Sequence, residues 1–594
     1  MEERWKVEGS PVHQAIWKRQ GVEVFNSPPL DLPGPVGAVM DRSLAAVRRH
    51  RQAGTRYGAD GFIAPALVAD LAEAGYWGLR ASRAYGGAGA SFQALANFTT
   101  EMAVIDPWVA GMMSCQACIG PVGLLEAFGS AEQKERLLRP LATGRRLGAF
   151  AVTEPGTSTD WGAIRTVGRA EGDWLFVSGE KLFITNAGPG RTVGTLCLIN
   201  GRHEMLVIEL PEREDEHFRT VSYRLKAPAH IRNVALVFDN LRVPGANILH
   251  PRRGDGRSIA YHALNHGRVA VCANAAGQLR VIAGSLIPWV QRRVTFGAPI
   301  GTRELVQRRL GWLAGRIVAC DAMTAWAAHL LDGEYCAELE CVTAKVFGSE
   351  SVKEACVEVL LKTHGGRALL DGNPFSDWLF DLLAPTVYEG ENEVLTLGYF
   401  HALAREHGEH YLAPIAAVLT ERPHEGAGGH RASASDLLSA GSHAATYAAW
   451  LVGEEVRHAI GRFQHRLSAD PAELAGVAHE LLGAMALEIS GVLRHFGAAV
   501  AHRQALTFDL ARRAQLATVM LVVGRYAARQ QDPLVRQAGI CAALDLGVRL
   551  TNSHPPSQLY QLVTDLGRAV SEDRFAPVND AERGAVLMAE STVT

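Results

Sequence analysis

The chain is 594 residues long, which is enough for three or four packed domains and for a large buried cofactor cavity. Its formal net charge of -3 gives no global electrostatic attraction to nucleic acid or acidic membranes, and 48% of hydrophobic residues is ordinary for a globular protein. Partners must therefore be inferred from local sites.

Neither the cysteines nor the N-terminus indicates secretion or a metal site. The nine cysteines are scattered, and the close pair Cys115 and Cys118 has no second pair or histidine set at zinc-like spacing. We therefore expect core thiols, without disulfides or metal. The segment Met1–Lys6 lacks the features of a signal peptide, and no run reaches the length of about 18 apolar residues that spans a bilayer. The sequence predicts a cytoplasmic protein without a membrane span.

The first half of the chain is predicted to be helical and then β. Residues 1–34 are expected to form an N-terminal arm. Residues 35–149 show 3.6-residue apolar spacing, with a capping-box pattern at Ser130–Gln133, and are predicted to form a helical domain. Over residues 150–255 the apolar period changes to two, which predicts an inserted β domain. Its expected strands are 174–177, 182–185, 193–199, 205–210 and 234–238.

Three dipeptides in the β region are turn signals. Ser178-Gly179, Asn200-Gly201 and Asp239-Asn240 contain residues that tolerate the positive φ required in hairpin turns. We therefore expect three hairpins there, within a compact antiparallel sheet or barrel.

Helical spacing returns in the second half of the chain. Residues 256–420 are predicted to form a C-terminal helical bundle. Residues 421–435 are polar and glycine-rich, which predicts a linker, and residues 436–594 are predicted to form a helical extension domain. The expected fold class is mainly α with an inserted β domain. Turns within the bundle are expected at 295–301, 364–367 and 372–374.

Two separated segments form the first chemical motif. Residues 150–160 read FAVTEPGTSTD, and residues 179–186 read GEKLFITN. Together they closely resemble the flavin-binding signature of the acyl-CoA dehydrogenase family. Such strand ends supply the N–H groups, hydroxyls and aromatic wall that a flat isoalloxazine ring needs. The alternative is an ordinary hairpin with capping hydroxyls.

The resemblance implies a role for individual residues of this motif. Thr153 backs the flavin ring, Thr185 reaches the flavin N5 atom, and Phe183 holds the position of an aromatic residue beside the flavin. No strand in the chain leads into a glycine-rich dinucleotide-binding helix, so FAD would be held without that fold. The other residues of the expected FAD site in this motif are Phe150, Val152 and Thr159.

The second motif is the turn Arg293–Gly301, which reads RVTFGAPIG and is followed by Gln307. It resembles the turn with which the family reaches the FAD of a neighbouring subunit. An arginine fork, a hydroxyl and a close backbone approach suit a pyrophosphate, because bidentate charge-assisted bonds fix its oxygens. The alternative is a solvated arginine at a helix end. The expected FAD-binding residues here are Arg293, Thr295, Phe296 and Gln307.

The third motif joins His364–Gly366 to the segment Asp381–Gly390, which reads DLLAPTVYEG. In the family its glutamate, Glu389 here, faces the α carbon of the substrate. Removal of a weakly acidic thioester α proton needs a carboxylate with a raised pKa, and donors for the developing enolate. A buried glutamate beside a glycine fits that need, whereas taken alone it would more often be a surface carboxylate.

Glu389 is the expected catalytic base. Some relatives carry the base on the helix before the second motif, but residues 265–268 read NHGR there and contain no carboxylate. By the family mechanism, Glu389 removes the α proton while a β hydride moves to flavin N5, which gives a 2-enoyl thioester. Arg268 is expected to be a structural or electrostatic partner of the base. The expected substrate-binding residues are Tyr388, Gly390 and Arg268.

The resemblance covers residues 40–405, with four departures from the family pattern. A carboxylate at Glu391 near the FAD phosphates would be repulsive unless paired, since unpaired like charges cost several kcal/mol in a dry site. Our hypothesis is that Lys362 pairs with Glu391; both belong to the expected cofactor site, with Gly365 and Gly366. The departures are Lys362 for glutamine, Glu391 for threonine or serine, Ser158 for glycine and Phe380 for arginine.

The extension resembles those of two branches of the family. In very-long-chain dehydrogenases it replaces the second dimer of a tetramer, and in the DNA-alkylation-response branch it is basic. From Glu406 to Thr594 the sequence holds 16 Arg, no Lys and 20 Asp plus Glu, a net charge of -4, which disfavours nucleic acid. Its apolar stretches, such as Leu516–Val523, are expected to pack on the catalytic domains rather than enter a membrane. We expect a homodimer of the very-long-chain type.

Three functions remain open. The first is FAD-dependent dehydrogenation of an acyl-CoA or acyl-carrier-protein thioester, with electron-transfer flavoprotein or a similar acceptor as partner. The second is the activity of an oxidase or monooxygenase of the same fold, and the third is weakly catalytic flavin binding that acts through the extension. Retention of Glu389 favours the first, because oxygenating relatives commonly lack that base.

Overall fold

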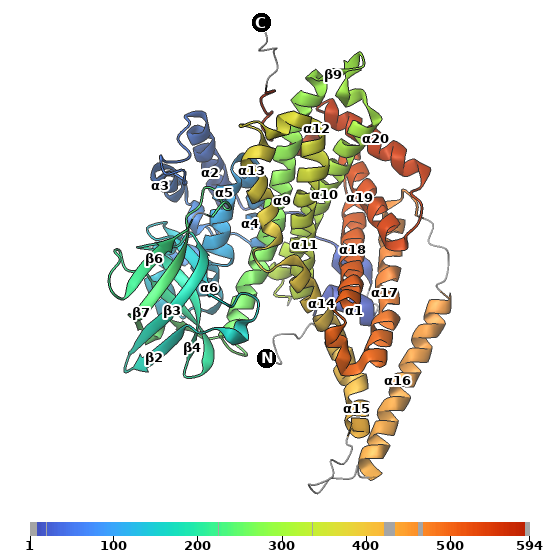
Figure 1. Cartoon of the computed structure of the whole chain (residues 1–594), viewed down its shortest axis with the longest axis horizontal. Coiled ribbons are helices and arrows are strands. Elements are labelled where there is room, and N and C mark those ends of the chain that lie inside the picture. Colours follow the sequence, from blue (N-terminus) through green and yellow to red (C-terminus); the bar gives the residue numbers. More distant parts are fainter. Residues whose placement is uncertain are drawn as a thin grey trace.

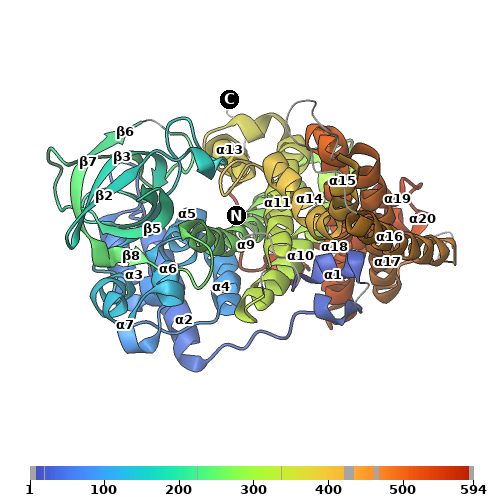
Figure 2. The same cartoon turned by 90° about the horizontal axis from the view of Figure 1, so that it is seen from below.

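The computed structural model describes residues 9–18, 21–223, 225–335, 337–420, 434–460 and 467–587. A β domain lies at one side of the molecule, long helices run through the middle, and the C-terminal helices lie at the other side (Figures 1 and 2). The predicted linker at 421–435 lies outside the described residues except for its last two positions, which begin helix α16 (Ala434–Ile460).

The N-terminal helical region follows its sequence signals closely. Ser130 and Gln133 form the predicted capping box, in which each side chain accepts a hydrogen bond from the backbone of the other residue. Helix α5 begins at Pro107 because the Asp106 carboxylate caps the first free N–H groups. The α-helices are α2 (Gly34–Gln52), α3 (Pro65–Ala74), α4 (Phe92–Ile105), α5 (Pro107–Met113), α6 (Pro121–Phe128), α7 (Ala131–Gln133) and α8 (Arg139–Ala142).

The β domain is a single eight-stranded sheet with its own apolar core. The strand order is β6-β7-β3-β2-β4-β5-β8, and β1 also pairs with β4. The expectation of a purely antiparallel sheet is wrong, because β1 and β2 both run parallel to β4. The strands are β1 (Gly148–Ala151), β2 (Val167–Glu171), β3 (Trp174–Thr185), β4 (Thr192–Ile199), β5 (Arg202–Glu209), β6 (Phe218–Ser222), β7 (Asn233–Pro244) and β8 (Ile248–Leu249).

Only one of the three predicted hairpins forms. Asn200 and Gly201, with φ of 50° and 75°, turn the chain from β4 into β5. Ser178-Gly179 and Asp239-Asn240 instead lie inside β3 and β7, where the two strands pair with a register shift. The Asn240 N–H donates to Ser178 Oγ at 2.9 Å across this shift. The residues that permit a turn therefore serve paired bulges, because bulges need the same positive φ.

The second helical region provides the centre of the molecule. Its predicted turn at 295–301 is confirmed as a short β9–β10 hairpin, with Phe296 and Gly297 at φ of 47° and 79°. The elements are α9 (Gly256–Arg292), β9 (Val294–Thr295), β10 (Ala298–Pro299), α10 (Glu304–Asp332), α11 (Glu338–Glu354), α12 (Lys362–His364), α13 (Pro374–Leu383), α14 (Asn392–His407) and α15 (Ala413–Thr420).

The extension packs against the side of α10 that faces away from the β domain (Figures 1 and 2). The approach is very close: a Cβ added at Gly311 of α10 would lie 1.9 Å from the Val563 carbonyl oxygen. A Cβ added at Gly567 would lie 1.7 Å from the Gln307 carbonyl oxygen. The extension is thus part of the packed core. Besides α16, its α-helices are α17 (Pro471–Phe496), α18 (Gln504–Ala528), α19 (Pro533–Thr551) and α20 (Ser557–Ser571).

The N-terminal segment lies beside the extension, not beside the N-terminal helices. Helix α1 (Pro11–Trp17) is capped by Ser10, whose hydroxyl donates to the buried Glu340 carboxylate of α11 at 2.6 Å. The Trp17 indole stacks on His407 of α14, with 4.4 Å between ring centroids. Further on, Glu23 pairs with Arg525 of α18 at 2.9 Å. The segment therefore joins the second helical region to the extension.

Among the described residues, three helical stretches are long and apolar enough to cross a membrane: Pro107–Phe128, Gly256–Arg292 and Pro471–His502. The expectation that the sequence contains no such stretch is therefore wrong: scattered polar residues interrupt the apolar runs, but the mean hydropathy of each stretch stays high. In the first two stretches 78% and 83% of the apolar window is buried within the protein, which accounts for their composition as core helices. In the third the buried share is 39%.

Candidate active site

The candidate base lies on a tight turn between α13 and α14. Glu389 and Gly390 both have positive φ, 59° and 97°, which is unusual for a glutamate. The buried Lys345 of α11 holds this turn, because its ammonium group donates to the Gly390 carbonyl at 2.6 Å and to Asn392 Oδ1 at 2.7 Å. A strained backbone of this kind persists only where surrounding contacts fix it. The turn therefore aims one side chain in a fixed direction.

The Glu389 side chain points toward helix α9 at a glycine. Glu389 Oε2 is buried and has no hydrogen-bond partner in the described part of the chain. A Cβ built on Gly267 would lie 2.9 Å from that oxygen and 2.4 Å from Ile119 Cγ2. Glycine at this position of α9 therefore leaves room for the carboxylate, which a larger residue would displace.

Burial makes this carboxylate a base near neutral pH. Burial raises the pKa of Glu389 to about 7, and the positive charges of Arg268 and Lys345 offset part of that rise. Burial also lowers the pKa of Lys345 to about 7, in which the nearby Arg268 assists. A carboxylate with such a pKa can both take and hold a proton under physiological conditions.

Arg268 is a buried electrostatic neighbour of the base. Its guanidinium donates to Asn265 Oδ1 at 2.8 Å and lies 3.9 Å from Glu338. Arg268 follows Gly267 on α9, and its positive charge lowers the pKa of Glu389. Its role as a partner of the base stays a prediction.

The first motif comes together in the β domain. The Leu182 N–H donates to the Thr153 carbonyl at 2.9 Å, which joins its two segments. A buried ion pair between Lys181 and Glu154, 2.7 Å apart, fixes the same junction from the inside. Phe183 is 55% exposed and has a φ of 58°. The exposed Phe183 ring is therefore available for a second flat ring to stack on it, and the strained backbone holds it in that position.

The other residues of this motif differ in exposure. Val152 is buried, and its carbonyl accepts from the Lys181 ammonium group at 3.2 Å. Thr159 is exposed, whereas Phe150 is half-buried. The Thr185 hydroxyl accepts a hydrogen bond from the Asn233 amide at 2.8 Å. The Asn233 contact thus keeps Thr185 oriented, whereas Val152 belongs to the hydrophobic core.

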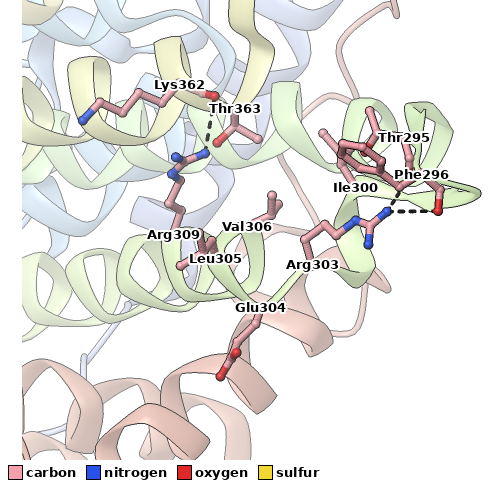
Figure 3. Close-up of a pocket in the computed structure, with 10 residues that line it drawn as sticks. All are labelled: Thr295, Phe296, Ile300, Arg303, Glu304, Leu305, Val306, Arg309, Lys362 and Thr363. Atoms are coloured by element: carbon pink, nitrogen blue, oxygen red, sulfur yellow. Dashed lines mark hydrogen bonds between the residues drawn. The ribbon is translucent and has the colours of Figure 1, made fainter.

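The second and part of the third motif form a separate surface around the β9–β10 hairpin. A pocket of about 580 Å³ lies there, and Phe296 projects from the hairpin with 98% exposure (Figure 3). Arg293 is exposed beside it. The Gln307 amide is buried and donates to the Gly301 carbonyl at 3.0 Å, so it shapes the turn from behind. The pocket is lined by Thr295, Phe296, Ile300, Arg303, Glu304, Leu305, Val306, Arg309, Lys362 and Thr363.

The hypothesis of a Lys362–Glu391 pair is wrong. The Lys362 ammonium group lies 2.5 Å from Glu358 of the same helical segment and points away from the hairpin (Figure 3). Glu391 is the N-cap of α14 and accepts from the N–H groups of Glu393 and Val394, both at 2.9 Å. Helix N-terminal N–H groups stabilise a carboxylate as a cation would, so Glu391 needs no lysine.

The two flavin-related surfaces do not meet within one chain. Strand β3, with Phe183 and Thr185, lies in the β domain at one side of the molecule, whereas the β9–β10 hairpin lies at the far end of α9 (Figure 1).

Each surface shows features that fit a flavin dinucleotide. A Cβ built on Gly366 meets nothing within 4 Å, so this glycine leaves open space rather than relieving a clash. The Thr363 hydroxyl beside it is buried and without a partner among described residues.

Comparison with known proteins decides the family. The family models "Acyl-CoA dehydrogenase, N-terminal domain" and "Acyl-CoA dehydrogenase, C-terminal domain" match residues 38–145 and 254–399. An acyl-CoA dehydrogenase of Bacillus subtilis (strain 168) is 30% identical over 335 residues, which cover 56% of this chain and 87% of that protein. The chain belongs to the acyl-CoA dehydrogenase family. Members of this family are flavoprotein oxidoreductases that use FAD.

Two further comparisons concern the extension. The mitochondrial very long-chain specific acyl-CoA dehydrogenase of Homo sapiens is 29% identical over 341 residues, 55% of this chain and 51% of that protein. The crystal structure of an acyl-CoA dehydrogenase with FAD from Bacillus anthracis has a TM-score of 0.74 at 17% identity, and covers 95% of this chain and 99% of that one. The fold with its extra C-terminal helices is thus shared with a solved acyl-CoA dehydrogenase.

Three residues that shape the site have little or no signal in the sequence. Lys345 was missed because a lysine inside a helix usually lies on its solvated face. Its only sequence signal is its place in the otherwise uncharged stretch 341–349. Asn233, which positions Thr185, was treated as the residue before a strand. Gly267 was noted only for lacking a carboxylate.

Proposed function

We propose that this protein dehydrogenates an acyl thioester to the 2-enoyl thioester, with Glu389 as the base and FAD as the hydride acceptor. The observation that carries the proposal is the Glu389 carboxylate itself. It is aimed by a strained turn, has a buried oxygen without a partner, and has a pKa of about 7. A structural carboxylate would have been given hydrogen bonds or an ion pair.

Proton abstraction follows from these contacts. Glu389 takes the α proton of the thioester, and Arg268 and Lys345 stabilise its charge before the transfer. Among the described residues, no group accepts a hydrogen bond from the Glu389 N–H, which leaves that donor for the thioester oxygen and its developing enolate charge. Bound FAD supplies the chemistry of hydride acceptance at N5, so that the β carbon loses a hydride as the α carbon loses a proton.

We further propose that the active form is a homodimer. Phe183 and Thr185 would hold the flavin ring of one protomer, while the β9–β10 hairpin of the second protomer would reach the rest of that FAD. Two facts support this: the hairpin carries the very exposed Phe296, and it lies far from β3 of its own chain. Large exposed aromatic side chains commonly mark an interface.

An oxidase or monooxygenase of the same fold is the second candidate. It would use the same flavin surface, but a carboxylate base of raised pKa has no evident task in oxygen activation. A weakly catalytic protein that acts through the extension is the third. The close packing of the extension at Gly311 and Gly567 supports a structural role for it.

The test is anaerobic reduction of the FAD-loaded protein by a panel of acyl-CoA and acyl-carrier-protein thioesters. We expect bleaching of the flavin absorbance together with an enoyl product for at least one thioester class. Reoxidation by electron-transfer flavoprotein, compared with reoxidation in air, separates a dehydrogenase from an oxidase. Absence of bleaching with every thioester, in protein that holds FAD, would refute the proposal, and rapid peroxide formation in air would favour the oxidase.

A further inference from the structure

Three side chains form a hydrogen-bonded series beside the irregular part of β3 at Phe183. The Phe183 N–H donates to the Tyr223 hydroxyl at 2.5 Å. The Tyr223 hydroxyl donates to Asn233 Oδ1 at 3.0 Å, and Asn233 Nδ2 donates to Thr185 Oγ1 at 2.8 Å. We call this series the Tyr223–Asn233 relay. It begins and ends on two residues of the same strand, both of which the family resemblance assigns to the flavin.

The relay starts where β3 leaves its regular pairing. The register with β7 shifts between Lys181 and Ile184, and Phe183 within this shift has a φ of 58°. Its N–H is directed to Tyr223 instead of to β7. The rings of Phe183 and Tyr223 also meet edge to face, with 5.5 Å between centroids. Tyr223 thus stabilises the bulge that exposes Phe183.

The direction of the relay follows from the atoms that meet. The Tyr223 oxygen accepts from the Phe183 N–H, which can only donate, and the Tyr223 hydroxyl donates to the carbonyl oxygen of Asn233. The NH₂ group of Asn233 is then directed to Thr185. The Thr185 oxygen then accepts, and its proton is left for a partner outside the relay.

We propose that Tyr223 and Asn233 are positioning residues that orient the Thr185 hydroxyl as a hydrogen-bond donor toward the flavin N5. The inference rests on the proposed function, in which Thr185 lies at N5. The N5 atom of an oxidised flavin carries a lone pair and accepts a hydrogen bond, so a donor is the matching partner. Without Asn233, the Thr185 proton could turn to another acceptor.

A double-mutant cycle tests this coupling. Asn233→Leu, Thr185→Val and the double variant are prepared as apoproteins, and FAD affinity and the visible flavin spectrum are measured for each. We expect Asn233→Leu alone to weaken FAD binding by about five- to tenfold and to shift the flavin absorption, because one oriented hydrogen bond is lost. In the Thr185→Val background the same change is expected to alter affinity less than about twofold, since there is no hydroxyl to orient.

The Thr185→Val background shows whether Asn233→Leu acts through the Thr185 hydroxyl or through a general distortion of strand β3. Equal losses from Asn233→Leu in both backgrounds, or no loss in either, would overturn the proposal. Tyr223→Phe is the second variant, and we expect it to shift the spectrum in the same direction while the melting temperature of the apoprotein stays close to that of Asn233→Leu.

Failure of this inference is distinguishable from failure of the proposed function. Affinity and spectrum require no thioester, so a wild-type protein that binds FAD but is never bleached refutes dehydrogenation and still allows the cycle to be read. A wild-type apoprotein that does not bind FAD would overturn both.

Discussion

The proton-abstraction site and the flavin-binding surfaces are assembled in different ways. Glu389, Gly267 and Lys345 come from three elements of one chain and are held together by buried contacts. The flavin-related residues lie on two exposed surfaces, one around Phe183 and one around Phe296, at different ends of the molecule. The position of the base is thus fixed within a single chain, whereas we infer that the complete FAD site forms only when two chains associate. Some substitutions should therefore change the rate of proton abstraction without changing FAD affinity, and others should do the reverse.

The largest effect is expected at the base. Glu389→Gln removes the proton acceptor but keeps the shape of the side chain, so we expect the rate of flavin bleaching by a thioester substrate to fall about 10³-fold. FAD affinity should remain within about twofold of wild type, because the flavin surfaces do not include this oxygen. Stopped-flow absorbance and a fluorescence titration with FAD measure the two quantities. A variant that bleached at the normal rate would exclude Glu389 as the base.

A substitution at Gly267, which faces the Glu389 carboxylate, should lower the rate by displacing the base. Gly267→Ala places a Cβ 2.9 Å from Glu389 Oε2, which forces the base away from its position. We expect the bleaching rate to fall about 10²-fold, as is typical of a displacement of about 1 Å at a reacting group. Gly476→Ala, where a Cβ meets nothing within 4 Å, is the matched control and should leave the rate unchanged. Normal kinetics for Gly267→Ala would show that the carboxylate is free to move.

Substitution in the β9–β10 hairpin should weaken dimer formation and leave the intrinsic rate of flavin bleaching unchanged. Phe296→Ala removes a 98% exposed aromatic side chain from the inferred interface, and we expect the dimer dissociation constant to rise about 30-fold, with weaker FAD binding. Light scattering and FAD titration measure these changes. At saturating FAD and high protein concentration, the bleaching rate should return to normal. The control is Tyr560→Ala on α20, an exposed aromatic residue outside both surfaces, and equal effects from both variants would contradict the assignment.

The pH dependence follows from the raised pKa of Glu389. The base must be ionised to accept a proton, so kcat/KM should fall about tenfold per pH unit below the pKa of about 7. The stability of the folded protein should change with pH in the opposite direction to the rate. Between pH 4.5 and about 7 the Glu389 carboxyl keeps its proton in the folded protein but loses it in the unfolded chain, so its contribution to stability falls as pH rises. Glu389→Gln should therefore raise the melting temperature at pH 8 more than at pH 4. A rate profile flat from pH 5 to 8 would contradict the buried environment of this group.

The smallest effect is expected at Lys362. Its ammonium group pairs with Glu358 on the surface, and such exposed pairs contribute little. Lys362→Gln should therefore leave FAD affinity and absorbance within about twofold of wild type. Glu391→Ala, in contrast, removes the N-cap of α14 and should lower the free energy of unfolding by about 1 kcal/mol. A loss of FAD in Lys362→Gln would show that the lysine reaches the cofactor from its present position.

Motifs with a fixed local geometry were predictable from the sequence, and partners distant in the chain were not. The turn at 295–301 could be placed because glycine and its neighbours determine that conformation locally, whereas Glu389 was singled out by the resemblance of its motif to the family. The hairpins expected at 178–179 and 239–240 were wrong, because a turn and a paired bulge use the same residues and only the pairing of β3 with β7 decides between them. The contacts of Lys345 and Asn233 depend on packing that no local pattern records.

The position of the N-terminal segment has a consequence for the order in which the protein folds during synthesis. Glu23 pairs with Arg525, which follows it by 502 residues, and α1 rests on α17 as well as on α11. During synthesis from the ribosome, the first helix therefore emerges long before its binding surface exists. Trp17 packs on His407 of α14 and on Trp450 of α16, so the docking of this helix is a late step of folding.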